Sequence, residues 1–353
     1  MRELSAEIRD KIKGYSEKFR RYMETEDYKQ DEKEREERKE IFKILDRDNI
    51  DGLEELEVRQ LVSSLWATGF FGNKEYVVNK ILQENGLDKI KTQLKNLLWG
   101  SDSLASRYNK FTIKGLGPAS VTEILTFVFP KECGIWNDKA RKALKILGFS
   151  ENELPLDKYQ ITGEEYVKFN RVLRLIADEL EQNTGLKEVD LIEVDYFLYV
   201  VYMDKKKGHD VEHEFDHDEI RDKIFNIGNS LGFEVEKELN IAKGSRVDVV
   251  WRAKIANLGV VTYVFEVHKR GSIDSLILNL QRAKNNPTVQ KLVAVSDKKH
   301  LEDIAKEAGT LPEDFRKALT YFDVGDVDEM WDSLEKVGKI LSKLELVKSD
   351  FGG

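Results

Sequence analysis

The spacing of apolar residues changes once along this chain, and that change constrains the fold more than any other feature. Up to about residue 203, apolar residues recur every three or four positions, as in "KEYVVNKILQEN" and "DKARKALKILGF". From about residue 217, helical segments alternate with short strand-like runs such as "SRVDVVW" and "TYVFEVH". Helical and strand periodicities in separate stretches indicate separate domains. We therefore predict an all-α domain followed by a mixed α/β domain.

The chain of 353 residues is long enough for two or three such domains. We predict a charged helical arm over 1–47, which is either solvated or a packing helix, and an all-α domain over 48–203. A polar segment containing Gly208 predicts a linker over 204–216. The order αβββαβα then predicts a sheet with helices on its faces over 217–310, and C-terminal helices follow over 311–353.

Composition narrows the class of protein. The single cysteine, Cys133, excludes an internal disulfide framework and a multi-cysteine zinc site, which favours a cytoplasmic protein. No signal-like start and no long apolar run is present, so we expect no membrane partner. The formal net charge of −9 predicts that any contact with DNA comes from local basic patches. The 35% of charged residues, rich in Lys and Glu, is typical of thermophile proteins.

Two acidic residues stand inside apolar strand-like runs. Asp248 lies in "SRVDVVW" and Glu266 in "TYVFEVH", and a turn near Asn257 separates the runs. In a hairpin centred there, paired positions sum to 514, so the two carboxylates face each other with Cβ atoms roughly 5 Å apart. Such a pair repels unless a cation holds it or one acid stays protonated. Paired oxygen ligands suit Mg²⁺ or Mn²⁺, which would support phosphodiester hydrolysis.

With these residues, the segment from about 216 to 308 resembles the PD-(D/E)xK nuclease superfamily. The resemblance implies a restriction-endonuclease-like αβββαβ domain and the activity of a metal-dependent DNA endonuclease. It assigns Asp248 and Glu266 as metal ligands, with a further ligand from the Val267 carbonyl, and Glu219 as an accessory acid. It also places His268 where most members carry lysine.

The histidine puts the rate and the metal preference in question. A neutral imidazole at His268 would orient or deprotonate water, or join the metal shell and favour Mn²⁺. Lys269 is expected on the opposite face of the strand. Ser272 is a plausible N-cap of the next helix, whose N-terminus beside Lys269 and Arg270 predicts a phosphate site. Asn279 and Gln281, on that helix, either face the site or are solvated.

The run "FTIKGLGPASVTEIL" in the first domain fits a helix-hairpin-helix pattern. Gly115 and Gly117 would form the tight turn, Leu116 would fill the core, and the next helix would point backbone N–H groups at a DNA phosphate. We predict DNA contacts from this turn and from nearby basic side chains, namely Lys114, Lys139, Arg141 and Lys142.

The longer run from Ile113 to Gly148 resembles helix-hairpin-helix base-excision glycosylases. In that family an aspartate follows the hairpin at a fixed interval, and some members carry a lysine inside the hairpin. Those positions fall on Asn137 and Ala119, which argues against glycosylase chemistry and favours a DNA-binding use of the scaffold.

Three histidines lie four residues apart in "GHDVEHEFDH", at His209, His213 and His217. On a continuous helix the first two would share a face and bind Zn²⁺ or Ni²⁺. The favoured interpretation is a polar linker in which Asp216 caps the following helix. The sequence as a whole predicts a DNA endonuclease, with a catalytically inactive DNA-binding or regulatory protein as the alternative. A homodimer is plausible, since two DNA strands require two cuts.

Overall fold

The structure is a computed structural model that describes residues 3–66, 74–206, 215–255 and 259–344. The chain divides into two compact units. We call the described residues up to 206 the helical unit and those from 215 onward the sheet unit. No helix in these described ranges is long and apolar enough to cross a membrane.

The helical unit contains α-helices and short 3₁₀ turns. Side-chain caps mark several helix starts: Thr162 accepts a hydrogen bond from the backbone N–H of Glu165, whose carboxylate accepts in return from the Thr162 N–H. The α-helices of this unit are α1 (Ala6–Met23), α2 (Glu26–Phe42), α3 (Glu55–Ser64), α4 (Lys74–Asn85), α5 (Leu87–Trp99), α6 (Leu104–Lys110), α7 (Pro118–Val128), α8 (Asp138–Leu147), α9 (Gly163–Thr184) and α10 (Leu191–Lys206).

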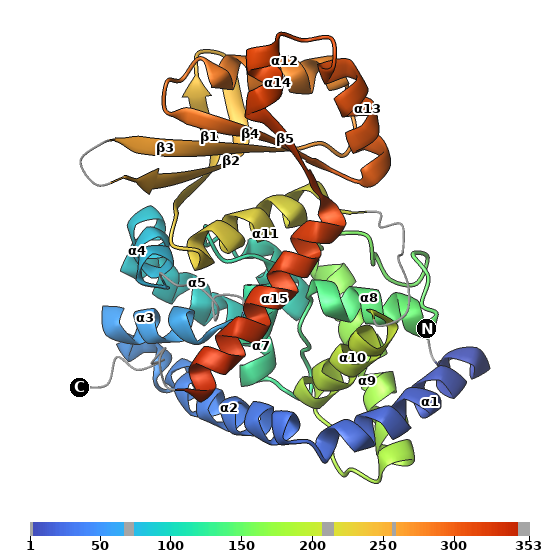
Figure 1. The fold of residues 1–353 in the computed structure, drawn as a ribbon. Helices are drawn as coiled ribbons and strands as arrows, with labels where there is room; N and C mark the ends of the chain where they lie inside the picture. Colours follow the sequence, from blue (N-terminus) through green and yellow to red (C-terminus); the bar gives the residue numbers. More distant parts are fainter. Residues whose placement is uncertain (1–2, 67–73, 207–214, 256–258, 345–353) are drawn as a thin grey trace. The chain divides into compact units, whose positions relative to one another are not determined.

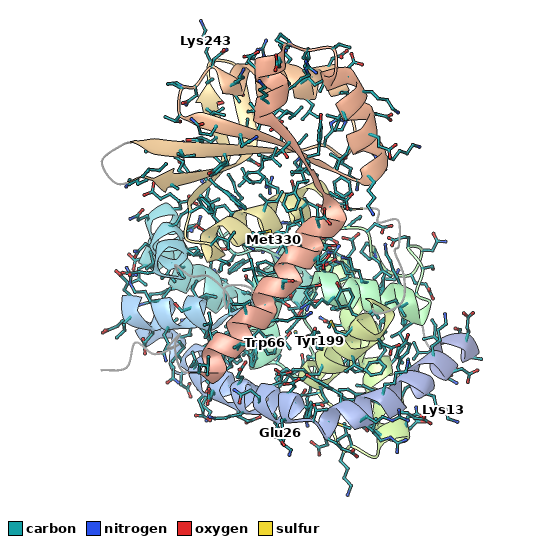
Figure 2. All side chains as sticks on the ribbon, viewed as in Figure 1. Lys13, Glu26, Trp66, Tyr199, Lys243 and Met330 are labelled. Carbon is teal, nitrogen blue, oxygen red and sulfur yellow. The ribbon has the colours of Figure 1, made fainter. Side chains whose placement is uncertain are left out.

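Helices α1 and α2 correspond to the predicted arm, and their apolar side chains are buried in the helical unit. Phe19 of α1 is fully buried, and its ring lies 5.8 Å from that of Phe197 on α10. Exposed charged residues such as Lys13 and Glu26 project from the opposite sides of these helices (Figure 2). Of the two alternatives for this segment, the structure therefore favours packing helices over a solvated arm.

The sheet unit is built on one five-stranded sheet in the order β1-β2-β3-β4-β5. The first three strands are antiparallel to one another, while β3, β4 and β5 run parallel. The strands are β1 (Glu234–Ala242), β2 (Ser245–Lys254), β3 (Val260–Val267), β4 (Val289–Ser296) and β5 (Leu319–Asp323). The helices are α11 (His217–Ser230), α12 (Ile273–Lys284), α13 (Lys298–Ala308), α14 (Glu313–Ala318) and α15 (Val324–Lys343).

Each face of this sheet has its own apolar core. One core joins α11 and α15 to strand residues such as Val249, Phe265 and Val295. The other joins α12, α13 and α14 to residues such as Val250, Val264 and Ala294. The sheet is thus a middle layer between two layers of helices (Figure 1). The predicted order αβββαβα from α11 to α13 is confirmed.

Two boundaries differ from the sequence-based prediction. The segment 311–353 was expected to contain helices alone, but it also contains strand β5, which pairs with β4 from Leu319 through Asp323. "LTYFD" is five residues long and half exposed, so it carries no clear period, and pairing with β4 gives it its extended form. Helix α10 extends to Lys206, inside the predicted linker, and the division between the units falls between Asp210 and Val211.

Candidate functional site

Each of the two acids of the central strands accepts a backbone hydrogen bond from the opposite strand of the β2–β3 pair. The ladder from Val249–Phe265 to Lys254–Val260 has the register expected for a hairpin centred near Asn257. Just beyond it, the Asp248 N–H donates to Glu266 Oε2 at 3.2 Å, and the Val267 N–H donates to Asp248 Oδ2 at 2.8 Å. The two carboxylates therefore take the place of backbone acceptors next to the pairing of Val249 with Phe265.

The sheet is irregular at this point, and the irregularity positions Asp248. Val247 and Val249 flank it but belong to cores on opposite faces of the sheet, so the usual alternation is broken. On the neighbouring strand β1, Glu238 has a φ of 52°, a left-handed conformation that is uncommon for a side chain other than glycine. The pairings Lys237–Val249 and Leu239–Val247 bracket this residue. A local twist of both strands thus presents the Asp248 carboxylate to β3.

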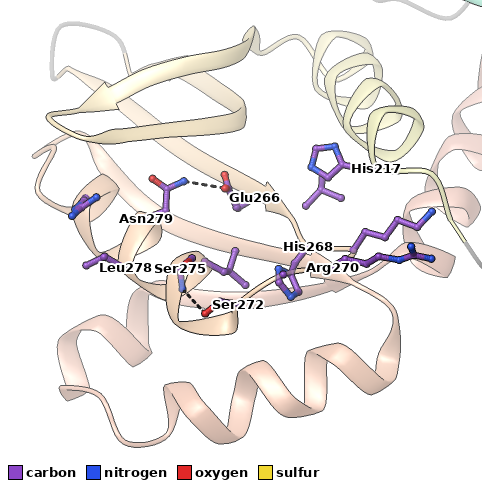
Figure 3. Close-up of a pocket in the computed structure, with 13 residues that line it drawn as sticks. His217, Glu266, His268, Arg270, Ser272, Ser275, Leu278 and Asn279 are labelled. Atoms are coloured by element: carbon purple, nitrogen blue, oxygen red, sulfur yellow. Dashed lines mark hydrogen bonds between the residues drawn. The ribbon is translucent and has the colours of Figure 1, made fainter. Parts of the chain in front are cut away.

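The environment of Glu266 strongly perturbs its ionisation. Burial, followed by the nearby charge of Asp248, raises the pKa of Glu266 to about 8. The Asn279 side chain on α12 donates to Glu266 Oε1 at 2.9 Å, which opposes this rise (Figure 3). Asn279 also donates to the Arg246 carbonyl at 2.8 Å, so its orientation is fixed by two acceptors. Of the two predicted orientations for Asn279, the structure has the one that faces the acid pair.

The cation beside Asp248 is a histidine that the sequence reasoning had assigned only to the linker cluster. His217 opens α11, and its Nε2 lies 3.4 Å from Asp248 Oδ2. The hydrogen bond to Asp248 is the largest cause that raises the pKa of His217, to about 9, and Asp218 adds to it. Asp216 caps α11 as predicted, by accepting from the N–H groups of Asp218 and Glu219. His209 and His213 lie outside the described residues.

A cavity of about 800 Å³ opens beside the acid pair. It is lined by Glu266, by the predicted phosphate-binding segment that includes Lys269 and Arg270, and by two histidines. These residues come from β3, α11, α12 and the segment between β3 and α12 (Figure 3). Ser272 caps α12 through the Ser275 N–H, as predicted. Among the residues that line the cavity are His217, Glu266, His268, Lys269, Arg270, Ser272, Asn279 and Arg282. Gln281, the other candidate on α12, is not among the lining residues.

The predicted accessory acid Glu219 has a different environment. Its side chain is buried, and Oε1 lies 3.2 Å from the ammonium of Lys223, which is also 2.6 Å from Asp328. Glu219 does not line the cavity. The contact between α11 and the acid pair is made by His217, two residues earlier, because a helix turns that position toward a different side.

His268 follows the last residue of β3 and is anchored by its backbone. Its N–H donates to the Val295 carbonyl at 2.7 Å, and its own carbonyl accepts from the Ser296 hydroxyl at 2.5 Å. The side chain is buried, and burial, reinforced by His300, lowers the pKa of His268. Lys269 lies over the Phe215 ring at 5.9 Å, and Phe215 belongs to the core on the α11 face. The ammonium of Lys269 therefore reaches the α11 face, opposite to Glu266 as predicted, although the residue also lines the cavity.

The glycine turn of the helical unit precedes α7. Gly115 has a φ of +90°, and a Cβ at this position would lie 2.7 Å from Cγ1 of Ile81, so two constraints favour glycine. Gly117 is the N-cap of α7. The residue that fills the core is Ile113, which is 4% exposed, rather than Leu116, which is only half-buried. Lys114 is exposed beside the turn.

The predicted basic patch near this turn requires a correction. Arg141 is only 4% exposed and donates inward to the carbonyl of Lys158 at 3.0 Å, so it is not available to a phosphate. Lys142 pairs with Asp138 at 2.9 Å. Lys139 lies over the ring of Tyr199 at 5.2 Å.

The two departures from the glycosylase pattern lie on ordinary helix positions. Asn137 caps α8 by accepting from the Ala140 N–H at 2.7 Å and donates to Asp195 at 3.1 Å. Ala119 is half-buried in the first turn of α7. Neither residue offers a group for base-excision chemistry.

Sequence reasoning did not identify His300 and Asp297, which lie beyond the end of β4, or the contact of His217 with Asp248. His217 was visible as a third histidine in a spaced series, but its partner is 31 positions away in the sequence and only the fold joins them.

Among the described residues, no three His, Cys, Asp or Glu side chains lie close enough together to hold a metal ion. No family model, curated protein or solved structure matches the chain.

Proposed function

We propose that this chain is a metal-dependent DNA endonuclease whose phosphodiesterase site is the Asp248–Glu266 pair. The observation that carries the proposal is the contact of Asp248 with β3 beside Glu266, which itself lines the cavity together with Lys269 and Arg270. Paired carboxylates next to cationic side chains are suited to a divalent ion and a phosphate. The order from α11 to β4 supports a restriction-endonuclease-like, PD-(D/E)xK fold for the sheet unit.

The donor set fits a hard divalent cation. Both acids have oxygen atoms with lone pairs beyond those used by the hydrogen bonds described above. Burial and the nearby charge of Asp248 raise the pKa of Glu266, and a cation bound between the two carboxylates would offset that cost. Asp248 and Glu266 would hold Mg²⁺ or Mn²⁺, with the Val267 carbonyl as a further oxygen donor. When bound, such an ion would polarise the phosphate and lower the pKa of a coordinated water.

The remaining side chains have separate tasks in this proposal. Asn279 orients Glu266 through its hydrogen bond at 2.9 Å. His217 offsets the charge of Asp248 and stands at the cavity, where it would contact the substrate phosphate. Lys269, Arg270 and the N-terminus of α12 would bind a backbone phosphate. His268 would orient the nucleophilic water from the lysine position. Glu219 would influence the site indirectly, through its ion pair with Lys223.

We further propose that the helical unit binds the DNA backbone. The turn at Gly115 and Gly117 leads into the N-terminus of α7, which supports a helix-hairpin-helix contact with phosphate. Of the basic side chains predicted to assist, Lys114 is the exposed one beside the turn. Homodimerisation stays a prediction from the need to cut two strands.

The alternative is a DNA-binding or regulatory protein without catalysis on the same scaffold. It is favoured by the absence of a lysine at position 268 and by the absence, among the described residues, of three His, Cys, Asp or Glu side chains grouped so that they could hold a metal ion. In that case the acid pair would only stabilise the pairing of β2 with β3, and His217 would be its permanent counter-ion.

The test is cleavage of linear, branched and single-stranded DNA with Mg²⁺ or Mn²⁺. Asp248→Asn and Glu266→Gln keep the side-chain shape but remove the charge, and both should abolish cleavage. Glu236→Gln, which changes an acid on β1 paired with Arg252, is the matched control and should cut normally. DNA binding without cleavage by the wild type under every condition would support the alternative. Equal cleavage by wild type and both site variants would reject this site.

A further inference from the structure

A second group of side chains with metal-binding chemistry lies where β3 and β4 end. His268 follows β3, and Asp297 and His300 follow β4 at the start of α13. The rings of His268 and His300 lie with centroids 6.2 Å apart in an edge-to-face arrangement. Parallel strands bring these residues together, because their carboxyl ends meet at one edge of a sheet.

Asp297 fixes the orientation of His300 with both carboxylate oxygens. Oδ1 accepts from the His300 backbone N–H at 3.0 Å and caps α13, while Oδ2 lies 2.7 Å from His300 Nδ1. A carboxylate at Nδ1 requires the proton there, which leaves the lone pair of the neutral ring on Nε2. This carboxylate-to-histidine arrangement is the usual outer-shell support of a metal-binding imidazole.

We propose that His268 and His300 form a binding site for a borderline divalent transition metal such as Zn²⁺ or Cu²⁺, with Asp297 as the positioning residue. A metal–nitrogen distance of ~2.1 Å and a ring radius of about 1.2 Å would put the centroids roughly 5.3 Å apart in a tetrahedral site. The observed separation of 6.2 Å is about 1 Å larger. The His300 side chain is 42% exposed, so a small tilt of its ring that keeps the contact between Nδ1 and Asp297 would close that gap.

This site differs in chemistry from the acid pair. Imidazole nitrogen suits Zn²⁺ and Cu²⁺, whereas carboxylate oxygen suits Mg²⁺ and Mn²⁺. No third His, Cys, Asp or Glu completes the pair within the described part of the chain. The other coordination positions are therefore open to water or to an anionic ligand. His268 lines the cavity, so such a ligand reaches the metal from there.

The test is titration of the full chain with Cu²⁺, followed by electron paramagnetic resonance, in which nitrogen hyperfine structure reports bound imidazoles. The wild type should show two nitrogen ligands, and His300→Ala should lose one of them and bind at least about tenfold more weakly. Asp297→Asn keeps a good N-cap but offers an N–H to His300 Nδ1, so it should weaken binding by about 10- to 100-fold. Circular dichroism would verify that both variants are folded.

His213→Ala is the control, because it removes an imidazole from the histidine series and leaves His268, His300 and Asp297 unchanged in sequence. Its Cu²⁺ spectrum should match that of the wild type. A spectrum lost in His213→Ala but unchanged in His300→Ala would overturn the proposal, as would a wild type with no nitrogen-coordinated Cu²⁺. The inference does not rest on the proposed nuclease function, and the readout requires no cleavage, so the two proposals fail independently.

Discussion

Glu266→Gln should change how the stability of the sheet unit depends on pH. The folded chain raises the pKa of Glu266 from 4.5 to about 8. Between these values the unfolded chain releases the proton and the folded chain retains it, so the free energy of unfolding falls as pH rises. From pH 5 to pH 8 the free energy of unfolding should fall by about 3 kcal/mol. The slope is ~1.4 kcal/mol for each pH unit in the middle of the window and smaller near the two pKa values. Glutamine stays neutral throughout, so its variant should lack this decline.

The measurement is hydrogen exchange of peptides that span β2 and β3, which reports the opening free energy of the sheet unit separately from that of the helical unit. Comparison of the wild type with the variant cancels the contribution of titrating groups that lie far from Glu266. The wild type should lose about 3 kcal/mol more than Glu266→Gln between pH 5 and pH 8. Parallel pH profiles would show that Glu266 is ionised at little cost, and would refute the reasoning from burial and charge repulsion. Mn²⁺ at pH 8 should restore the loss in the wild type alone.

Two further predictions test single positions. Gly115→Ala should lower the free energy of unfolding in urea by about 1–3 kcal/mol more than Gly86→Ala does. Both glycines have a positive φ, but only at Gly115 would an added Cβ come close to another side chain, that of Ile81. Equal losses of stability would contradict this. The imidazole of His217 should titrate by NMR with a pKa of about 9 in the wild type and lower in Asp248→Asn, since Asp248 is the largest cause of the rise; an unchanged pKa would mean that the pair is not formed in solution.

The order and pairing of the first strands could be predicted because the signals are local. Apolar alternation in "SRVDVVW" and "TYVFEVH", with a short turn between them, defines a hairpin, and in a hairpin the turn sets the register. The register of Val249 with Phe265 agrees with that reasoning. The N-caps Asp216 and Ser272 were equally readable, because each acts within three residues of itself.

Several features of the site could not be read in this way. The break in alternation at Asp248 lies opposite Glu238 of the neighbouring strand. The left-handed φ of Glu238 cannot be predicted from the local sequence. Glu219 had the expected position on α11 but meets Lys223, since the rotation of a helix about its axis is set by its packing. Arg141 looked like a surface cation but is buried, where its guanidinium contacts the Lys158 carbonyl and Asp138.

The sequence by itself determined the order of elements from α11 to α13 and the hairpin that brings Asp248 close to Glu266, because these depend on neighbours within about twenty residues. Only the tertiary structure decided which side chains join those acids. His217, Asn279 and His300 come from three helices, and their distances to Asp248, Glu266 and His268 are set by how α11, α12 and α13 pack on the two faces of the sheet. Packing is a collective property of both cores, so no single segment of the chain encodes it.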